Sequence, residues 1–596
     1  MFIRYVSVRI MAHCKAFRPL SNPSFSEWGG LRSEGLSPLT TAMRCCFLSL
    51  LFCLVSPAFA QAPELGGLLP SGGLRGQITK VRIDGKNLVG ARLHLAGTGI
   101  AVKSLQVNPS GEQLTAELAV DSSALLGPHE VRITTPKGAS NGSRFWVDVY
   151  PNHVLEQPMQ EGTPPLALDN LAPVVINSRI LTRAGRDRFT FVANAGEEWV
   201  FDCFADRIRS RFDPVLELTD EAGVSVHLAL STWESDPRFC HRFTKAGRYS
   251  LTVRDSEYNG GSNYTYRLLV GRLPYVSQYS PRGGTPGSQV QVALQGINLS
   301  PTRATVTIPK EAPLGTYWAE VAQDSGKPVL LPLQVTADVV VAHTASLRAY
   351  TLPQLPIAID GVFAETSKAR FWFHATAQKK YLFDLLGRRI GSRIDGEIRV
   401  LSAEGKEIAI NDDAPGFGKE ARLKFTAPAT GAYQIEIRNV EEIMGANCYY
   451  RLKARAIEPD FQLSIATDRL AVAQRGNTSL TVTVERLGGF AGAVEVFVEG
   501  LPVGITAPNA VIPADKPSVD IKIVASAEAT VSSSDIHIRG KAVIGGKTVL
   551  REAPAWERYE HRSIDLLLSV EYSYTRPYHL WEMLLLSVTP FVPPAK

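Results

Sequence analysis

The chain has 596 residues, of which 45% are hydrophobic, 8% aromatic and 20% charged. These proportions exclude an intrinsically disordered protein, and a mean hydropathy of −0.01 excludes a polytopic membrane protein. Residues 1–60 contain six basic and two acidic residues, so most of the net charge of +5 lies there; the other 57 basic and 56 acidic residues show no sign of a nucleic-acid-binding domain.

The first 60 residues contain a pattern typical of a secretory leader. From Met43 the chain has one positive charge, an apolar run over 45–55 and the small exit Ala58-Phe59-Ala60. The run is too short to span a bilayer. We therefore expect a signal peptide at 43–60 with cleavage near Ala60, a secreted, periplasmic or cell-surface location, and no integral membrane segment in the mature chain. Residues 1–42 precede a good start Met, and we interpret them as an over-extended gene start.

Three cysteines remain after this leader, Cys203, Cys240 and Cys448, which is too few for a disulfide framework. Alternation places Cys203 on the inward face of its strand together with a phenylalanine. In the run 239–243 the phenylalanines face inward, so Cys240 points outward. One inward and one outward sulfur cannot easily reach the Cβ separation of roughly 3.5–4.5 Å that a disulfide needs, and we expect none between Cys203 and Cys240.

Period-two alternation dominates the mature chain. Its clearest runs begin at Phe189, Tyr249, Tyr433, Leu480 and Val494. Between such runs lie clusters of Gly, Asn, Asp and Pro at the short intervals expected of β-sandwiches. The sequence therefore predicts an all-β fold, a tandem array of β-sandwich domains.

The chain also repeats itself. Residues 201–213 match residues 383–395 at an offset of 182, and the same offset pairs Phe243-Thr244 with Phe425-Thr426. A second repeat lies upstream of each, because Gly76, Gly85 and Asn87 recur at an offset of 211 as Gly287, Gly296 and Asn298. We infer two copies of a two-module unit, in which the second leading module is the shorter.

These repeated motifs resemble known secreted modules. Segments 174–272 and 358–458 resemble the bacterial pre-peptidase C-terminal domain, a jelly-roll-like sandwich, through Phe-Asp, Ser-Arg-x-Asp, a Gly-x-Tyr strand and a closing Tyr-x-Leu strand. The preceding modules resemble immunoglobulin-like IPT/TIG domains through Gly-x-Asn-Leu and the stretch Leu126-Gly-Pro-His-Glu-Val131. The segment 460–555, with Gly500-Leu-Pro-Val-Gly504, is similar to a further immunoglobulin-like domain. The whole arrangement resembles large secreted proteins of planctomycete-type bacteria.

The resemblance and the repeats together predict the domain boundaries. IPT/TIG-like domains are expected at 61–150 and 273–338, domains similar to the pre-peptidase C-terminal (PPC) domain at 165–272 and 339–458, and an immunoglobulin-like sandwich at 459–555. A tail follows at 556–596, and within it residues 580–588 are expected to form a closing strand or docking segment.

Catalytic motifs are weak. Gly138-Ala-Ser140-Asn-Gly142 fits Gly-x-Ser-x-Gly, but it lies between two strand patterns with no helix after it, so a hairpin turn is the favoured interpretation. His129-Glu130 lacks the second His of a zinc helix. We therefore expect the chain not to be an enzyme.

Five charged or polar residues recur in both copies. They suggest either a duplicated binding site or an Arg–carboxylate network with a turn at the sandwich edge. The network is favoured, because each module must fold by itself. The pairs are Asp202/Asp384, Arg207/Arg389, Ser210/Ser392, Arg211/Arg393 and Asp213/Asp395.

The best ion candidate is the triplet Asn411-Asp412-Asp413, to which Asp395 could add a carboxylate. Clustered side-chain oxygens suit Ca²⁺, which takes six to eight oxygen ligands, and the PPC resemblance implies calcium because collagen-binding relatives bind it. The alternative is a solvated Asx-rich turn, since the first copy lacks the triplet. No other cofactor is expected.

The sequence thus favours a secreted, non-enzymatic multi-domain β-sandwich protein for adhesion, scaffolding or ligand binding at the bacterial cell surface. Its partner would be an extracellular protein or polysaccharide. The alternative is an accessory subunit of a secreted hydrolase, a peptidase or glycosidase, whose catalytic domain is on another chain.

Overall fold

The structure is a computed structural model that describes residues 62–231, 236–343, 350–414, 420–557, 560–565, 570–575, 579–581 and 583–591. The expected leader, its cleavage site and the gene start therefore lie outside the described residues. Within them the regular elements are strands and two short 3₁₀ turns, η2 (Asp206–Ile208) and η3 (Arg388–Ile390). The predicted all-β fold is confirmed. The described part of the chain contains no helix long and apolar enough to cross a membrane.

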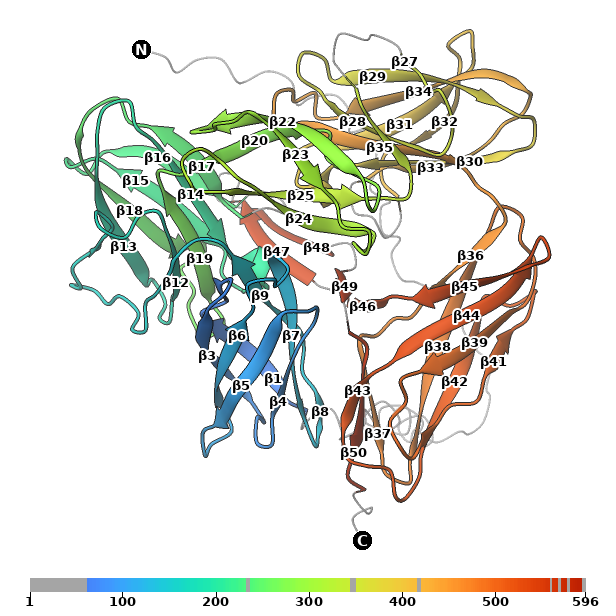
Figure 1. Cartoon of the computed structure of the whole chain (residues 1–596), viewed down its shortest axis with the longest axis horizontal. Coiled ribbons are helices and arrows are strands. Elements are labelled where there is room, and N and C mark those ends of the chain that lie inside the picture. The colour runs from blue at the N-terminus through green and yellow to red at the C-terminus, as the bar shows by residue number, and fades with distance from the viewer. Residues whose placement is uncertain are drawn as a thin grey trace, which may run out of the picture. The chain divides into compact units, whose positions relative to one another are not determined.

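The strands form five successive sandwiches, each with its own buried apolar cluster. Sandwich 1, blue in Figure 1, pairs the sheet β1-β3-β6-β5 with the sheet β2-β9-β7-β4, to which β8 adds. Its strands are β1 (Glu64–Leu69), β2 (Gly72–Leu74), β3 (Ile78–Lys86), β4 (Arg92–Leu95), β5 (Ile100–Val107), β6 (Gln113–Val120), β7 (Gly127–Thr135), β8 (Gly138–Ala139) and β9 (Ser143–Asp148).

Sandwich 2 has two five-stranded sheets, in the orders β10-β12-β19-β14-β17 and β11-β13-β18-β15-β16. In β13 the phenylalanines at 189 and 191 are fully buried while their neighbours are less so, as the alternation predicts. The strands are β10 (Asn152–Val154), β11 (Leu166–Ala167), β12 (Val174–Arg179), β13 (Arg186–Ala193), β14 (Glu198–Phe204), β15 (Pro214–Thr219), β16 (Ser225–Leu230), β17 (Arg238–Arg242), β18 (Gly247–Asp255) and β19 (Thr265–Gly271).

Sandwich 3 is the smaller version of sandwich 1. It keeps two three-stranded sheets, β20-β22-β23 and β21-β25-β24. The pairing of β2 with β9 recurs as the parallel pairing of β21 with β25. Its strands are β20 (Tyr275–Ser280), β21 (Gly283–Gly284), β22 (Gln289–Ile297), β23 (Arg303–Thr307), β24 (Gly315–Val321) and β25 (Val329–Val335).

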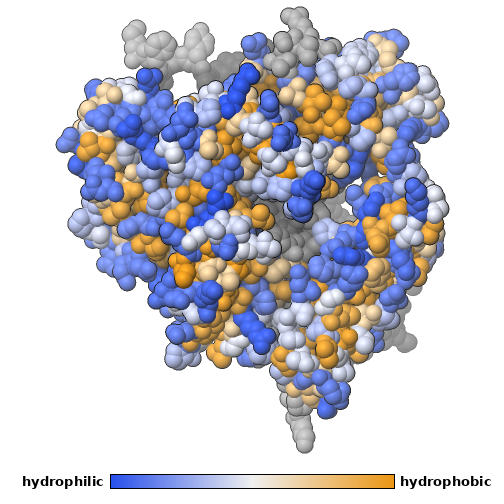
Figure 2. All heavy atoms as spheres, in the orientation of Figure 1, coloured by the Kyte–Doolittle hydropathy of each residue, from blue (hydrophilic) through white to orange (hydrophobic). Residues whose placement is uncertain are grey.

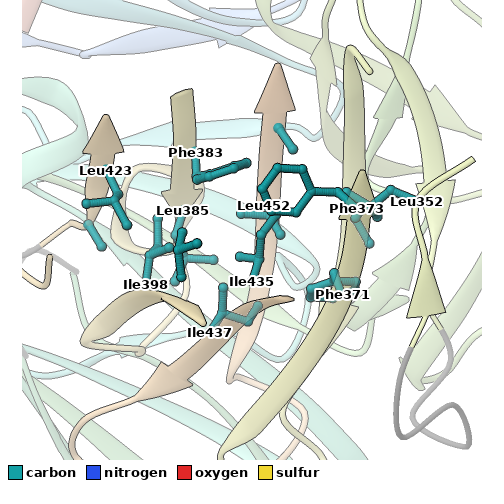
Figure 3. Packing of buried hydrophobic residues seen from close by; sticks show 14 of the residues in the cluster. Leu352, Phe371, Phe373, Phe383, Leu385, Ile398, Leu423, Ile435, Ile437 and Leu452 are labelled. Atoms are coloured by element: carbon teal, nitrogen blue, oxygen red, sulfur yellow. The ribbon is translucent and has the colours of Figure 1, made fainter. Parts of the chain in front are cut away.

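Sandwich 4 repeats the topology of sandwich 2, with sheets β26-β28-β35-β30-β33 and β27-β29-β34-β31-β32. Figure 3 shows its core, where Phe373, Phe383 and Leu452 from different strands converge. The strands are β26 (Val339–Ala342), β27 (Tyr350–Thr351), β28 (Ile357–Val362), β29 (Lys368–Ala375), β30 (Lys380–Leu386), β31 (Gly396–Leu401), β32 (Glu407–Asn411), β33 (Arg422–Thr426), β34 (Gly431–Asn439) and β35 (Tyr449–Ala456).

The register of the two copies corrects one sequence pairing. His227 lies opposite Leu218 as Ala409 lies opposite Val400, so the offset is still 182 in β16 and β32. In the next strands Asp202 faces Arg238 and Asp384 faces Arg422, which makes the offset 184. The pairing of Phe243-Thr244 with Phe425-Thr426 is therefore wrong by two residues, because the loop before β33 is two residues longer.

Sandwich 5, orange to red in Figure 1, is closed by the end of the chain. Strand β50 (Leu585–Thr589) lies between β37 (Arg469–Ala473) and β43 (Ser533–Asp535), parallel to the first and antiparallel to the second. The tail thus supplies a strand of this sandwich at 585–589, which overlaps the second half of the segment 580–588. The sandwich also contains β36 (Asp460–Ser464), β38 (Asn477–Leu487), β39 (Val494–Glu499), β40 (Ile505–Thr506), β41 (Ala510–Ile512), β42 (Ser518–Ala525), β44 (His537–Ile544) and β45 (Lys547–Ala553). The tail also contains two antiparallel two-stranded sheets, β46 (Ala555–Glu557) with β49 (His579–Trp581), and β47 (Glu560–Asp565) with β48 (Val570–Thr575).

Candidate ligand-binding site

The repeated arginines are held by two carboxylates each. Arg207 in η2 forms ion pairs with Asp202 on β14 and with Asp236, whose Oδ2 lies 2.9 Å from the Arg207 Nε. Asp236 also accepts the backbone N–H of Asp206 at 2.7 Å. One carboxylate therefore fixes both the 3₁₀ turn and the guanidinium that leaves it. Burial alone would lower the pKa of Arg207, but the two carboxylates outweigh it and raise the pKa, so the charge persists.

The second copy builds the same clamp with a different acid. Arg389 in η3 pairs with Asp384 at 2.7 Å and with Glu420. Glu420 accepts the backbone N–H groups of Gly387 and Arg389 at 2.9 and 2.8 Å. Asp236 and Glu420 occupy equivalent positions at the offset of 184. The sequence comparison missed both, because the acids differ and the offset changes just before them.

The other repeated residues form the turn that follows. Ser210 donates to the carbonyl of Asn263 at 3.0 Å, and Ser392 donates to the carbonyl of Asn447 at 3.1 Å. The backbone N–H of Arg211 and of Arg393 donates to the same two carbonyls. Asp395 continues the turn, since its carbonyl accepts the backbone N–H of Val440 at 2.7 Å, as Asp213 accepts that of Ser256. The hydrogen bonds of these repeated residues therefore fix the turn at the sandwich edge in both copies.

A further buried arginine joins sandwiches 1 and 2. Arg267 on β19 pairs with Asp148 at the end of β9, and their side chains are 1% and 6% exposed. Asn177 on β12 contributes its Oδ1 to Arg267 at 3.3 Å. Burial raises the pKa of Asp148 to about 6 although Arg267 lowers it, so the carboxylate is ionised at neutral pH.

At the contact between sandwiches 3 and 4 the equivalent arginine, Arg451, is paired with a carboxylate from a different strand. Arg451 on β35 forms a bidentate pair with Asp360 on β28, at 2.6 and 2.7 Å, and donates to the carbonyl of Gln334 at 3.1 Å. Asp360 faces Arg451 in the register in which Asn177 faces Arg267. The position of Asp148 is taken by Thr336, as the pairing of β2 with β9 and of β21 with β25 shows. The carboxylate has therefore moved from the leading sandwich to the following one.

Beside these arginines lies a cavity of about 410 Å³. Its lining comes from sandwiches 1 to 4 and is mainly apolar and aromatic, with the rings of Trp146 and Trp318 packed edge to face at 5.0 Å. Burial raises the pKa values of Tyr275 and Tyr279 to about 12, so both phenols stay neutral, and the Tyr279 hydroxyl donates to the carbonyl of Pro332 at 2.7 Å. A concave, largely apolar site with a few polar groups is the usual form of a small-molecule site.

Arg282 is the unusual member of this lining. It is only 4% exposed, and its guanidinium lies over the rings of Tyr449 and Tyr279, with centroids 3.1 and 4.3 Å from Cζ. Its backbone N–H donates to Asp360. Among the described residues the guanidinium itself has no carboxylate or carbonyl partner, in contrast to Arg207, Arg267 and Arg389. Arg238, exposed at the cavity wall, lies 5.9 Å from the centroid of the Tyr275 ring and likewise forms no ion pair within the described part of the chain.

Of the predicted calcium residues, Asn411, Asp412 and Asp413 lie at the end of β32, whereas Asp395 immediately precedes β31. Asn411 accepts the backbone N–H of Arg422 at 2.9 Å, and Asp412 accepts that of Asp413 at 2.9 Å. Asp412 and Asp413 are exposed. No group of three or more His, Cys, Asp or Glu side chains within the described ranges is arranged to hold a metal ion. Calcium at Asp395, Asn411, Asp412 and Asp413 stays a prediction.

The serine motif lies in a hairpin but not at its turn, because Gly138-Ala139 already forms β8 against β7 and residues 140–142 link β8 to β9. Ser140 is fully buried, donates to the carbonyl of Asn141 at 2.7 Å and accepts the backbone N–H of Ile133 at 2.9 Å. Glu130 instead belongs to a buried ionic contact, because it pairs with Arg132, whose Nη2 lies 2.6 Å from Asp468 of sandwich 5.

Cys203, Cys240 and Cys448 are free. Cys203 lies in the core of sandwich 2, whereas Cys240 packs on the opposite face of the sheet. Cys203 and Cys240 thus lie on opposite faces of the sheet, as the alternation predicts, but Cys240 is half-buried there instead of pointing into solvent.

On the face shown in Figure 2, hydrophilic and hydrophobic side chains are interspersed.

No protein-family model matches the chain, and no curated protein matches its sequence. Solved structures match it at low identity. Alpha-2-macroglobulin of Escherichia coli, activated by porcine elastase, aligns at 10% identity with a TM-score of 0.14, covering 84% of this chain and 54% of that one. Surface layer protein SbsC, domains 1–6, aligns at 10% identity and a TM-score of 0.13, covering 90% and 60%.

A third structure is the M60 catalytic domain of Clostridium perfringens ZmpB with its two CBM51 domains. It aligns at 12% identity with a TM-score of 0.14 and covers 66% of this chain and 45% of that one. The chain thus spans about half the length of the solved proteins it matches. At these scores the likeness does not establish a common arrangement of domains, and the activities of those proteins are not transferred to this chain.

Proposed function

We propose that the chain is a secreted, non-enzymatic multi-domain β-sandwich protein that serves in adhesion, scaffolding or ligand binding at a bacterial cell surface. The leader pattern at 43–60 supports export. The tandem sandwiches support a scaffolding role, because buried Arg–carboxylate contacts such as Arg267–Asp148 join one sandwich to the next. Such contacts tie neighbouring modules together through buried ion pairs.

The observation that carries the binding role is the cavity beside Arg282. It combines aromatic walls with a buried cation whose charge the described neighbours leave uncompensated. A buried cation without a partner is costly in free energy, and a fold retains it where a ligand supplies the missing charge. Catalysis would need a nucleophile or base beside a second activating group, and the serine of the Gly-x-Ser-x-Gly stretch is instead engaged by backbone groups.

The finer assignment of modules is also part of the proposal. Sandwiches 2 and 4 are proposed as PPC-like domains, supported by their identical sheet orders and by the repeated arginine clamp. Sandwiches 1 and 3 are proposed as IPT/TIG-like domains.

A pull-down from the native cell envelope tests this proposal. The mature chain, immobilised through its C-terminus, is incubated with solubilised envelope, and the retained material is identified by mass spectrometry and sugar analysis. Retention of a polysaccharide or surface-layer component supports a binding scaffold. Stoichiometric retention of a peptidase or glycosidase would favour an accessory subunit instead.

A further inference from the structure

We propose that the cavity beside Arg282 binds a small organic carboxylate whose body is apolar or aromatic. This inference rests on the proposed binding function and names the ligand class of its site. Arg282 supplies the cation with which such a ligand would pair. Its guanidinium is buried over the rings of Tyr279 and Tyr449, and among the described residues it has no carboxylate or carbonyl partner. A planar guanidinium edge matches the two oxygens of a carboxylate.

The charges that line the cavity single out Arg282. Arg207, Arg267 and Arg389 line the same cavity but are already paired with carboxylates. Only Arg282 and Arg238 among the described lining arginines lack such a partner. One incoming negative charge would complete Arg282.

The rest of the cavity wall is largely apolar. Trp146, Trp318 and Leu273 present apolar surface beside the arginine. The volume of about 410 Å³ lies within the usual range for small-molecule sites and is too small for a folded partner. An apolar ring or chain would bury its surface against these side chains while its carboxylate reaches Arg282.

The test is calorimetric titration of the full mature chain with matched probes. Benzoate is the carboxylate probe, benzamide its neutral counterpart, glucuronate a carboxylate on a polar ring, and inorganic sulfate an anion without an organic body. We expect benzoate to bind at one site per chain, and more tightly than the other three. Arg282→Gln should weaken benzoate binding at least tenfold. Arg303→Gln removes an exposed arginine of β23 in the same sandwich and should leave binding unchanged.

The variants also keep the test decisive. If Arg282→Gln does not fold, as judged by its melting midpoint, Arg238→Gln replaces it, and a loss of benzoate affinity is again expected. Equal binding of benzamide overturns the need for charge, tighter glucuronate or sulfate binding overturns the apolar body, and unchanged binding in the cavity variants overturns the location. Envelope capture that persists while benzoate fails to bind sinks only this inference and leaves the proposed function standing.

Discussion

The buried arginine is paired with a carboxylate from the leading sandwich in the first copy and from its own sandwich in the second. This difference predicts the effect of exchanging the two arrangements by mutation. Asp148→Thr converts the contact between sandwiches 1 and 2 to the residue found at the equivalent place of the second copy, Thr336. It leaves Arg267, whose side chain is 1% exposed, with only the amide of Asn177 as a side-chain partner. Breaking a buried pair by removing one member costs about 3–5 kcal/mol.

The second substitution should repair the first. Asn177→Asp places a carboxylate where Asp360 stands in the second copy, directly opposite the arginine in the β-sheet register. We expect the double variant Asp148→Thr/Asn177→Asp to recover most of the lost stability. The charge is then supplied from β12 instead of β9, as it is from β28 in sandwich 4.

The assay is differential scanning calorimetry of the full mature chain. Because a chain with several sandwiches need not unfold in one step, the midpoint of the transition that moves is compared between variants. For a unit of about 200 residues, each kcal/mol shifts the midpoint by about 2–4 °C, so the single variant should lose about 6–20 °C. Glu64→Gln is the control, because it breaks the exposed pair of Glu64 with Lys86 and should cost less than about 1 kcal/mol.

Two results would refute this reasoning. If Asp148→Thr shifts the midpoint no more than the Glu64 control, the buried pair is not what holds the contact. If the double variant is no more stable than Asp148→Thr, the carboxylate cannot be supplied from β12 and the equivalence of the two contacts is wrong.

Four further predictions concern single positions. Burial raises the pKa of Cys240 to about 12, so its thiolate fraction at pH 8 is about 10⁻⁴. Iodoacetamide should therefore not label Cys240 before denaturation, and rapid labelling of the native protein would contradict its burial. Glu420→Ala removes the acceptor of two backbone N–H groups in η3 and one ion-pair partner of Arg389, and should destabilise sandwich 4 by about 1–3 kcal/mol in the same calorimetric assay. An unchanged melting midpoint would show that Glu420 does not stabilise this turn. If calcium binds at the end of β32, saturation at 100-fold over its Kd adds about 2.7 kcal/mol, a melting shift that Asp412→Asn should abolish; the absence of a shift with calcium against chelator leaves an ordinary turn. Mass spectrometry of the exported protein should find Gln61 as its N-terminus, and peptides from residues 1–42 would exclude the assigned start.

Sequence reasoning could predict the parts of the fold that depend on local pattern. Alternation in β13 and β18 identified buried faces, since side chains of a strand point to opposite sides in turn. The repeat found Arg207 and Arg389 together with Asp202 and Asp384, because those residues lie five positions apart within a conserved spacing.

The rest depends on contacts between distant segments. Asp236 and Glu420 escaped comparison because the two-residue insertion precedes them and because an aspartate had become a glutamate. The role of Arg267 was hidden although its Tyr-Arg-Leu motif repeats, since its carboxylate comes from another module in one copy and from its own module in the other. Arg282 had no sequence signal at all, because its environment is assembled by Tyr279 and by Tyr449 some 170 residues later.

The central claim is that the chain binds an extracellular ligand and does not transform it. The most direct measurement incubates the purified mature chain with washed envelope from the native cell and follows two quantities together, the protein that sediments with the insoluble fraction and the soluble fragments released from it. The account predicts saturable sedimentation, reduced by Arg282→Gln, with no release above that of envelope alone. Time-dependent release of sugar or peptide fragments that scales with protein concentration would contradict it.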